Sequence, residues 1–152
     1  MGAARTDSGP AVSLHLEGAV GRAGITWWNF YFRLYRRTIR AAEVADFLGH
    51  LLRHLPGKLL VVWDGLPAHR GRAVKQFVAA QHGRLALEQL PAYAPELNPT
   101  EYIWGHLKHH ERANSCAQTF GALKRHARNR LRSMQRRPTL IRAFWQQAEL
   151  PL

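Results

Sequence analysis

The pattern of apolar and polar residues predicts a helix between two strands in the first half of the chain. A continuous apolar run from Leu59 to Trp63 predicts a strand buried on both faces, and Asp64 with Gly65 predicts the turn at its end. Residues 30–35 alternate between apolar and polar side chains, which predicts a strand with one exposed face. Between the two strands, apolar residues follow helical spacing at Val44, Phe47, Leu48, Leu51, Leu52 and Leu55. This order is typical of a crossover helix that covers one face of a sheet.

The rest of the chain predicts one more strand and four more helices. A short helix ends near Gly83, and residues 85–90 form the strand. Asn98 is suited to cap a helix and Pro99 to its first position, so a helix begins there after a proline-stiffened loop. The three closing helical patterns cover residues 100–111, 119–136 and 139–148. Elements in this order predict an α/β layered domain over residues 30–152.

Residues 1–29 form a lead-in whose pattern is weak. A short strand is expected around His15, followed by a glycine-rich loop over residues 18–24. Trp27 and Trp28 are expected to pack against the domain rather than to stack on bases, because no recognised stacking platform surrounds them.

Length and composition limit the number of domains, the cellular compartment and the kind of binding partner. The 152 residues suffice for one domain with a core. Lys and Arg number 22 against 10 Asp and Glu, and the resulting net charge of +12 favours a polyanionic partner, usually nucleic acid. A single cysteine, Cys116, excludes an intramolecular disulfide and indicates a reducing compartment. Without an apolar run of about 18 residues, the sequence predicts a cytoplasmic protein that has no membrane partner.

Two carboxylates are placed by rigid elements. Asp64 follows the end of a strand, and Glu101 lies 37 positions later in the first turn of a helix. Oxygen ligands of this kind suit a divalent cation such as Mg²⁺. Taken singly, each residue has a structural alternative: Asp64 as part of a common turn, and Glu101 as the partner of Asn98 in a capping box.

Two longer motifs carry a family resemblance. They are VVWDGLPAHR at residues 61–70 and LPAYAPELNPTE at residues 90–101, followed by Trp104 and by Leu107-Lys108. In this order they resemble the DDE transposases of the mariner-like superfamily, in the branch carried by bacterial insertion sequences. The resemblance covers about residues 30–150, is weak before residue 30, and implies a ribonuclease-H-like fold.

The resemblance also implies a chemistry. In that family three carboxylates hold two Mg²⁺ ions during DNA cleavage, and the freed 3′-hydroxyl then attacks target DNA. Asp64 matches the second carboxylate and Glu101 the third. His69 is expected to orient the site or to contact phosphate, with an ordinary surface histidine as the alternative. Asn98 is expected to support the site from behind Glu101.

The first carboxylate of the family pattern has no match. The acidic residues before Asp64 are Asp7, Glu17, Glu43 and Asp46. Glu43 and Asp46 lie in the predicted crossover helix, and Asp7 lies in a predicted turn. The 47 positions from Glu17 to Asp64 leave room for one strand and one helix, whereas the fold requires two more strands and a helix. The sequence is therefore expected to be the C-terminal part of a catalytic domain that lacks its first strand. It is also too short for an attached domain that binds transposon ends. We expect weak Mg²⁺ binding at most, and little or no DNA cleavage by this polypeptide alone.

Basic residues provide candidate DNA contacts. Lys108 follows Glu101 at about 10 Å along one helix face and could neutralise a phosphate. The helix over residues 119–136 has one apolar stripe and one basic face, with Lys124, Arg125, Arg128, Arg132, Arg136 and Arg137. No acidic residue lies between Glu111 and Glu149, so nothing in this stretch offsets the repulsion among the basic side chains. This face could bind a DNA backbone, or it could simply be solvated.

Three hypotheses follow from the sequence. The first is a truncated DDE transposase catalytic domain. The second is a DNA-binding module without catalysis, which forms homo-oligomers or mixed oligomers with a full-length transposase. The third is a remnant without activity, whose open sheet edge favours aggregation.

Overall fold

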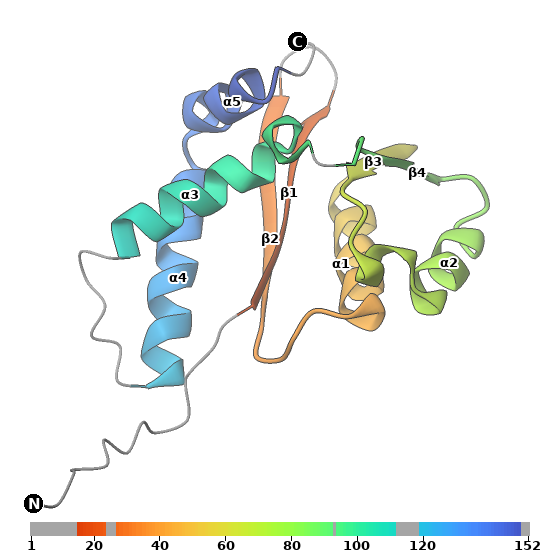
Figure 1. The fold of residues 1–152 in the computed structure, drawn as a ribbon, viewed down its shortest axis with the longest axis horizontal. Helices are drawn as coiled ribbons and strands as arrows, with labels where there is room; N and C mark the ends of the chain where they lie inside the picture. The colour runs from red at the N-terminus through yellow and green to blue at the C-terminus, as the bar shows by residue number, and fades with distance from the viewer. Residues whose placement is uncertain (1–14, 24–26, 93, 112–118, 150–152) are drawn as a thin grey trace, which may run out of the picture.

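The computed structural model describes residues 15–23, 27–92, 94–111 and 119–149. Long strands at the centre separate two groups of elements, with α3, α4 and α5 on one side and α1, α2, β3 and β4 on the other (Figure 1). The elements are β1 (His15–Ala23), β2 (Trp27–Tyr35), α1 (Ala41–His54), β3 (Leu59–Trp63), α2 (Arg72–Ala79), β4 (Leu85–Gln89), α3 (Pro99–Glu111), α4 (Phe120–Gln135) and α5 (Pro138–Gln147), with short 3₁₀ turns η1 (Pro67–Arg70) and η2 (Pro95–Leu97).

The described strands form two separate sheets of two strands each. β1 and β2 are antiparallel and pair along their whole length, from His15 opposite Tyr35 to Ala23 opposite Trp27. β3 and β4 are parallel, with Leu59 opposite Leu85. The prediction of a glycine-rich loop after His15 is therefore wrong, because pairing with β2 keeps this stretch extended. The packing expected for the side chains of Trp27 and Trp28 lies outside the described residues.

Helices pack on both faces of β2. Phe30 is fully buried and, with Phe32 and Leu34, packs against α3, α4 and α5. On the opposite face, Tyr31 packs with the apolar residues of α1. The predicted exposed face of this strand is covered in part, because α1 packs on Tyr31 while 36% of the Arg33 side chain remains exposed.

β3 is covered on one face only. Leu59, Val61 and Trp63 pack with α1, whereas the side chains of Leu60 and Val62 are 59% and 52% exposed. The prediction of a strand buried on both faces is wrong. Its apolar run is real, but within the described part of the chain only the α1 side of the strand is covered.

The predicted helices are confirmed, and local chemistry explains several of their ends. α1 ends before Gly57, whose φ of +82° reverses the chain at little cost for glycine. Gly71 lies against α1 so closely that an added Cβ would be 2.3 Å from the Cβ of Ala41. α4 begins after Thr119, whose Oγ1 accepts a hydrogen bond from the Ala122 amide at 3.2 Å.

Candidate functional site

Asp64 lies directly after β3, and its own loop holds its carboxylate. Oδ1 accepts a hydrogen bond from the Leu66 amide at 3.2 Å and lies 2.9 Å from Nδ1 of His69. The side chain is 39% exposed, so solvent reaches the carboxylate. The turn expected at this position is present, and it orients the side chain rather than burying it.

His69 is buried, with 8% of its side chain exposed, so it is not an ordinary surface residue. Its Nδ1 also lies 3.0 Å from the backbone carbonyl oxygen of Asp64, so the ring contacts both the backbone and the side chain of that residue. The ring stacks on the indole of Trp63 at 4.4 Å between centroids and an angle of 4°. The sequence placed Trp63 in a buried strand and in the motif at residues 61–70, but it did not predict a contact with His69. The contact between Trp63 and His69 depends on how the η1 turn folds. A spacing of six residues between two side chains does not by itself predict that they touch.

Glu101 lies in the first turn of α3 with an exposed side chain. Asn98 begins this helix as predicted: its Oδ1 accepts a hydrogen bond from the Thr100 amide at 3.1 Å. The amide of Asn98 itself donates to the carbonyl of Pro95 at 3.0 Å. In a capping box this amide would donate to the Glu101 carboxylate, so helix capping does not account for Glu101.

The chain connects the two carboxylates through one anchored loop. The Leu90 amide donates to the carbonyl of Trp63 at 2.7 Å, which places the start of the loop beside the residue before Asp64. From the carboxyl ends of β3 and β4 the loop crosses to the first turn of α3 (Figure 1). At its far end, the Tyr102 hydroxyl donates to the carbonyl of Glu96 at 3.0 Å. In the described part of the chain, no group of three or more His, Cys, Asp or Glu residues is arranged to hold a metal ion.

The acidic residues upstream of Asp64 have structural partners where they are described. Glu43 is buried, accepts a hydrogen bond from the Arg40 amide at 3.0 Å and forms an ion pair with Arg37. Asp46 accepts hydrogen bonds from Arg33 at 3.1 Å and from the Tyr35 hydroxyl at 2.8 Å. These two carboxylates attach α1 to β2 and to the segment that follows it. Glu17 lies on β1 in register with Arg33, and Asp7 lies outside the described residues.

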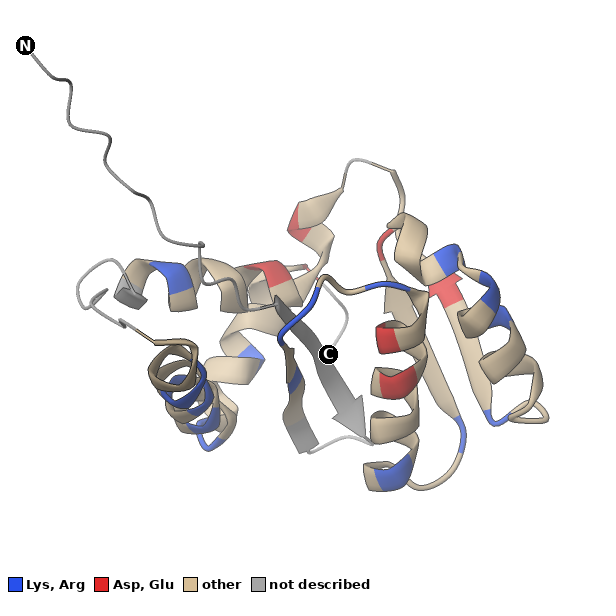
Figure 2. Ribbon diagram, turned by 90° about the horizontal axis from the view of Figure 1, so that it is seen from below, with Lys and Arg blue, Asp and Glu red and all other residues tan. Residues whose placement is uncertain are grey.

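The basic residues predicted to contact DNA lie on two helices. Lys108 is exposed on α3. Basic residues recur along α4, where Arg125, Arg128 and Arg132 are exposed and Lys124 is half-buried (Figure 2). The opposite side of α4 is buried through Ala127, Leu131 and Met134, as predicted from the apolar stripe.

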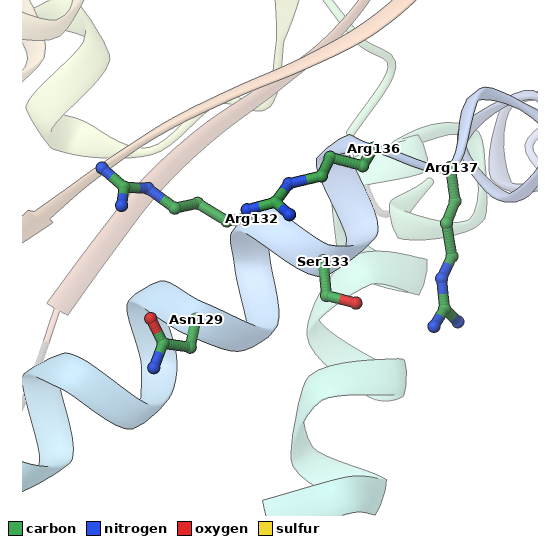
Figure 3. A pocket seen from close by; sticks show the side chains of 5 residues that line it. All are labelled: Asn129, Arg132, Ser133, Arg136 and Arg137. Carbon is green, nitrogen blue, oxygen red and sulfur yellow. The ribbon is translucent and has the colours of Figure 1, made fainter.

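A polar pocket lies at the C-terminal end of α4. It is lined by Asn129, Arg132, Ser133, Arg136 and Arg137, and Figure 3 shows these side chains projecting from the last turns of the helix and its end. Three guanidinium groups with an amide and a hydroxyl can donate hydrogen bonds to an anion such as phosphate. The sequence predicted that the three arginines lie on a basic helix face. It did not distinguish Asn129 and Ser133 from other polar residues.

Comparison with known proteins identifies a family and a fold. A sequence profile described as "DDE superfamily endonuclease" matches residues 17–137. The match begins within β1 at residue 17, whereas the resemblance carried by the motifs begins at about residue 30. No curated protein matches the chain.

Several solved structures of Mos1 mariner transposase are similar to this chain. The catalytic domain of Mos1 mariner transposase has 17% identity and a TM-score of 0.56, with 90% of this chain and 74% of that chain covered. The same domain solved with raltegravir and Mg has 17% identity and a TM-score of 0.58, with 90% and 79% covered. The Mos1 paired-end complex with the left transposon end has 17% identity and a TM-score of 0.59, with 98% of this chain but only 46% of that chain covered.

These structures confirm the predicted ribonuclease-H-like fold class. The two small sheets of the described residues are consistent with part of that fold. None of the described helices is both long enough and apolar enough to cross a membrane.

Proposed function

Because the chain belongs to the DDE superfamily of endonucleases, we propose that it is part of a DNA transposase catalytic domain. In this proposal Asp64 and Glu101 supply the second and third carboxylates of a site for DNA cleavage and strand transfer. The observation that carries it is the orientation of the Asp64 carboxylate at the end of β3. The Leu66 amide and the buried His69 both contact this carboxylate. The buried ring of His69 contacts this solvent-accessible carboxylate and stacks on the indole of Trp63.

The donor set suits magnesium. Asp64 and Glu101 offer carboxylate oxygens, which Mg²⁺ prefers, and both side chains reach solvent, from which the ion retains several waters. When bound, such an ion activates water and neutralises charge on the phosphate. His69 and the Leu66 amide orient Oδ1 of Asp64 and leave Oδ2 for the ion, while Asn98 positions the helix turn that carries Glu101.

Two carboxylates fit one ion better than the two ions of the complete family site. We therefore propose that residues 1–152 alone cleave DNA little or not at all. The test incubates this polypeptide with supercoiled plasmid and Mg²⁺ or Mn²⁺, and measures the fraction nicked. Nicking that depends on the metal and disappears in Asp64→Asn would contradict the proposed inactivity while supporting the assignment of Asp64.

A direct test of the metal site does not need activity. Binding of Mn²⁺, followed by its paramagnetic broadening of nearby NMR signals, should affect the amides around Asp64 and Glu101 together. Asp64→Asn and Glu101→Gln should each weaken binding by about tenfold or more. Glu88→Gln, at an exposed site on β4, is the control. Broadening at only one of the two carboxylates would rule out the shared site.

The basic face of α4 is proposed to bind the DNA backbone. Lys124, Arg125, Arg128 and Arg132 lie along one helix whose opposite side packs against the core, so the helix can present them together. Lys108 on α3 would add a contact beyond Glu101. Binding of this kind weakens steeply as salt rises and depends little on base sequence.

Charge-matched variants separate this face from net charge. Replacing Arg125, Arg128 and Arg132 by Gln should weaken binding to a 30-base-pair duplex and reduce the slope of log affinity against log salt by about 2–3. The control replaces three exposed cations on α1 and α2, at Arg53, Arg72 and Lys75, by Gln. Equal losses in both variants would show that total charge, rather than α4, controls binding.

A DNA-binding regulator of a full-length transposase is the second candidate. The observation that favours it is the extended basic face of α4. The same chain supplies only two carboxylates to the proposed site, whereas the family site has three. Tight, salt-dependent DNA binding without cleavage, together with mixed oligomers when the chain is co-expressed with a full-length transposase, would support this role. A chain that binds neither DNA nor a transposase would instead match an inactive remnant.

A further inference from the structure

The polar pocket at the end of α4 is built mainly on one face of that helix. Asn129, Arg132, Ser133 and Arg136 follow one another at intervals of three, one and three positions, so they share a face, and Arg137 lies where α5 begins. The pocket has a volume of about 370 Å³, and small-ligand sites typically have about 300–1,000 Å³. It can therefore receive one small polar group together with part of the molecule that carries it.

The side chains that line this pocket have no partners in the protein. Within the described part of the chain, none of the five forms a hydrogen bond or an ion pair. Other arginines are occupied: Arg33 and Arg37 form ion pairs with acidic residues of α1, and Arg84 donates to three backbone carbonyls at the C-terminal end of α1. The donors of the pocket thus remain available for a ligand.

Helix capping alone does not explain the three arginines. The helix dipole favours a cation at a C-terminal end, which suits Arg132 and Arg136 in α4. Arg137 is the N-cap of α5, where the dipole disfavours a cation. The sequence offers no acidic residue from position 112 to position 148, so no nearby carboxylate offsets the repulsion among these side chains. A bound anion would offset it.

Charge and acceptor number identify the anion. A phosphate within a DNA backbone is a diester with a single negative charge. A terminal phosphate is a monoester, which carries a charge of about −1.5 to −2 and three strong acceptor oxygens at pH 7. The three guanidinium groups match the monoester in both respects, and Figure 3 shows Arg136 turned back along α4 towards Arg132. Earlier in the helix, Arg125 and Arg128 supply about one cation per turn, which suits the single charges of backbone diesters.

We propose that this pocket binds the terminal phosphate monoester of a DNA strand whose backbone follows the basic face of α4. The inference rests on the proposed contact between α4 and the DNA backbone, and it adds an end point to that contact. Arg132 belongs to both the face and the pocket, so the strand end lies directly beyond the last backbone contact. Recognition of this kind reads the end of a strand and is independent of base sequence.

Binding of the full chain to duplexes with different ends tests the proposal. Fluorescence anisotropy at one fixed salt concentration compares 30-base-pair duplexes that end in 5′-phosphates, in 3′-phosphates or in hydroxyl groups only. At least one phosphorylated duplex should bind about fivefold or more tightly than the hydroxyl duplex. The same duplex with its terminal phosphate methylated carries a diester at that end, and it should bind like the hydroxyl duplex.

Charge-matched variants locate the effect. Arg136→Gln combined with Arg137→Gln should reduce the preference for the phosphorylated end to about twofold or less. Arg125→Gln combined with Arg128→Gln removes the same charge, so it should weaken binding to every duplex and leave the preference intact. Ser133→Ala changes no charge and should reduce the preference by about threefold, because one donor is lost. Far-UV circular dichroism checks that each variant folds.

The outcomes distinguish this proposal from the DNA-binding role of α4. Equal, salt-dependent binding of all duplexes would overturn the pocket assignment and leave that role standing. A preference that both double variants reduce equally would also overturn the assignment, because net charge would then explain it. A free deoxynucleoside monophosphate that competes as well as the phosphorylated strand, at equal concentration, would identify a mononucleotide instead of a DNA end. Failure to bind any duplex would overturn both the proposed role of α4 and this inference.

Discussion

His69 contacts both the side chain and the backbone of Asp64. Its Nδ1 lies 2.9 Å from the carboxylate and 3.0 Å from the carbonyl oxygen of Asp64, and Trp63 covers one face of its ring. The sequence indicated the role of His69 through the resemblance. Its burial against Trp63 could not be predicted, because it depends on how the η1 turn folds back over the end of β3.

The first prediction concerns this contact. His69→Ala should lower the free energy of unfolding by about 1–3 kcal/mol, since a buried hydrogen-bonding ring is lost and the Asp64 loop is released. Urea unfolding monitored by circular dichroism measures the change. His109→Ala, at an exposed position on α3, is the control and should change stability by less than about 0.5 kcal/mol. Equal effects would argue against a specific role for His69.

A second prediction concerns the residue that begins α3. Asn98→Ala removes the acceptor of the Thr100 amide and should destabilise the protein by about 0.5–2 kcal/mol. Asn98→Asp keeps an acceptor oxygen and should retain most of the stability. Thermal unfolding distinguishes them. If the two substitutions are equally harmful, the side-chain oxygen of Asn98 is not what stabilises the helix start.

Among the elements, α1 has a buried face that was predicted from the sequence and polar contacts that were not. Apolar spacing predicted its buried face, as confirmed by Val44, Phe47 and Leu48. The roles of Glu43 and Asp46 emerged only from the structure, because their partners lie on β2 or in the segment between β2 and α1. A helical pattern predicts which face of a helix is polar, but it does not predict which residues of other elements contact that face.

Glu43 makes the start of α1 sensitive to acid. Burial by itself raises the pKa of its carboxyl, but the Arg40 amide, its own amide and the Arg37 guanidinium outweigh burial and lower that pKa below 4.5. Folding therefore favours the charged form. The stabilisation is present above pH 4.5 and is lost as pH falls through the lower pKa of the folded state.

The third prediction follows from that sign. Glu43→Gln should reduce stability near pH 7, and the difference from the unsubstituted protein should shrink as pH falls below about 4.5. Urea unfolding at a series of pH values measures this difference. Glu88→Gln on β4 replaces an exposed carboxylate and serves as the control. A constant difference at every pH would show that the charge of Glu43 is not what stabilises α1.

At the scale of the whole molecule, β2 connects two apolar clusters. Phe30 belongs to the cluster of α3, α4 and α5, while its neighbour Tyr31 packs on the cluster around α1. Gln135 strengthens the connection by donating from α4 to the Phe30 carbonyl at 2.6 Å. Shared use of one strand should make the two clusters unfold together.

The fourth prediction tests that cooperativity. Leu48→Ala in one cluster and Ile141→Ala in the other should each cost about 2–5 kcal/mol, because both side chains are almost fully buried. Each should shift a single unfolding transition when it is followed by both tryptophan fluorescence and circular dichroism. Leu66→Ala, at an exposed position, should have little effect. Two separate transitions would mean that β2 does not couple the clusters.

Sequence patterns predicted most element positions, the strand end that carries Asp64, the helix start that carries Glu101, and the basic face of α4. Periodicity, capping and turn chemistry act within a few residues, so they can be recognised without knowledge of the rest of the chain. Only the fold shows that Tyr31 is packed, that Leu60 and Val62 are exposed, and that His69 is buried in contact with Asp64. Burial depends on which distant element covers a face, and no local pattern encodes that choice.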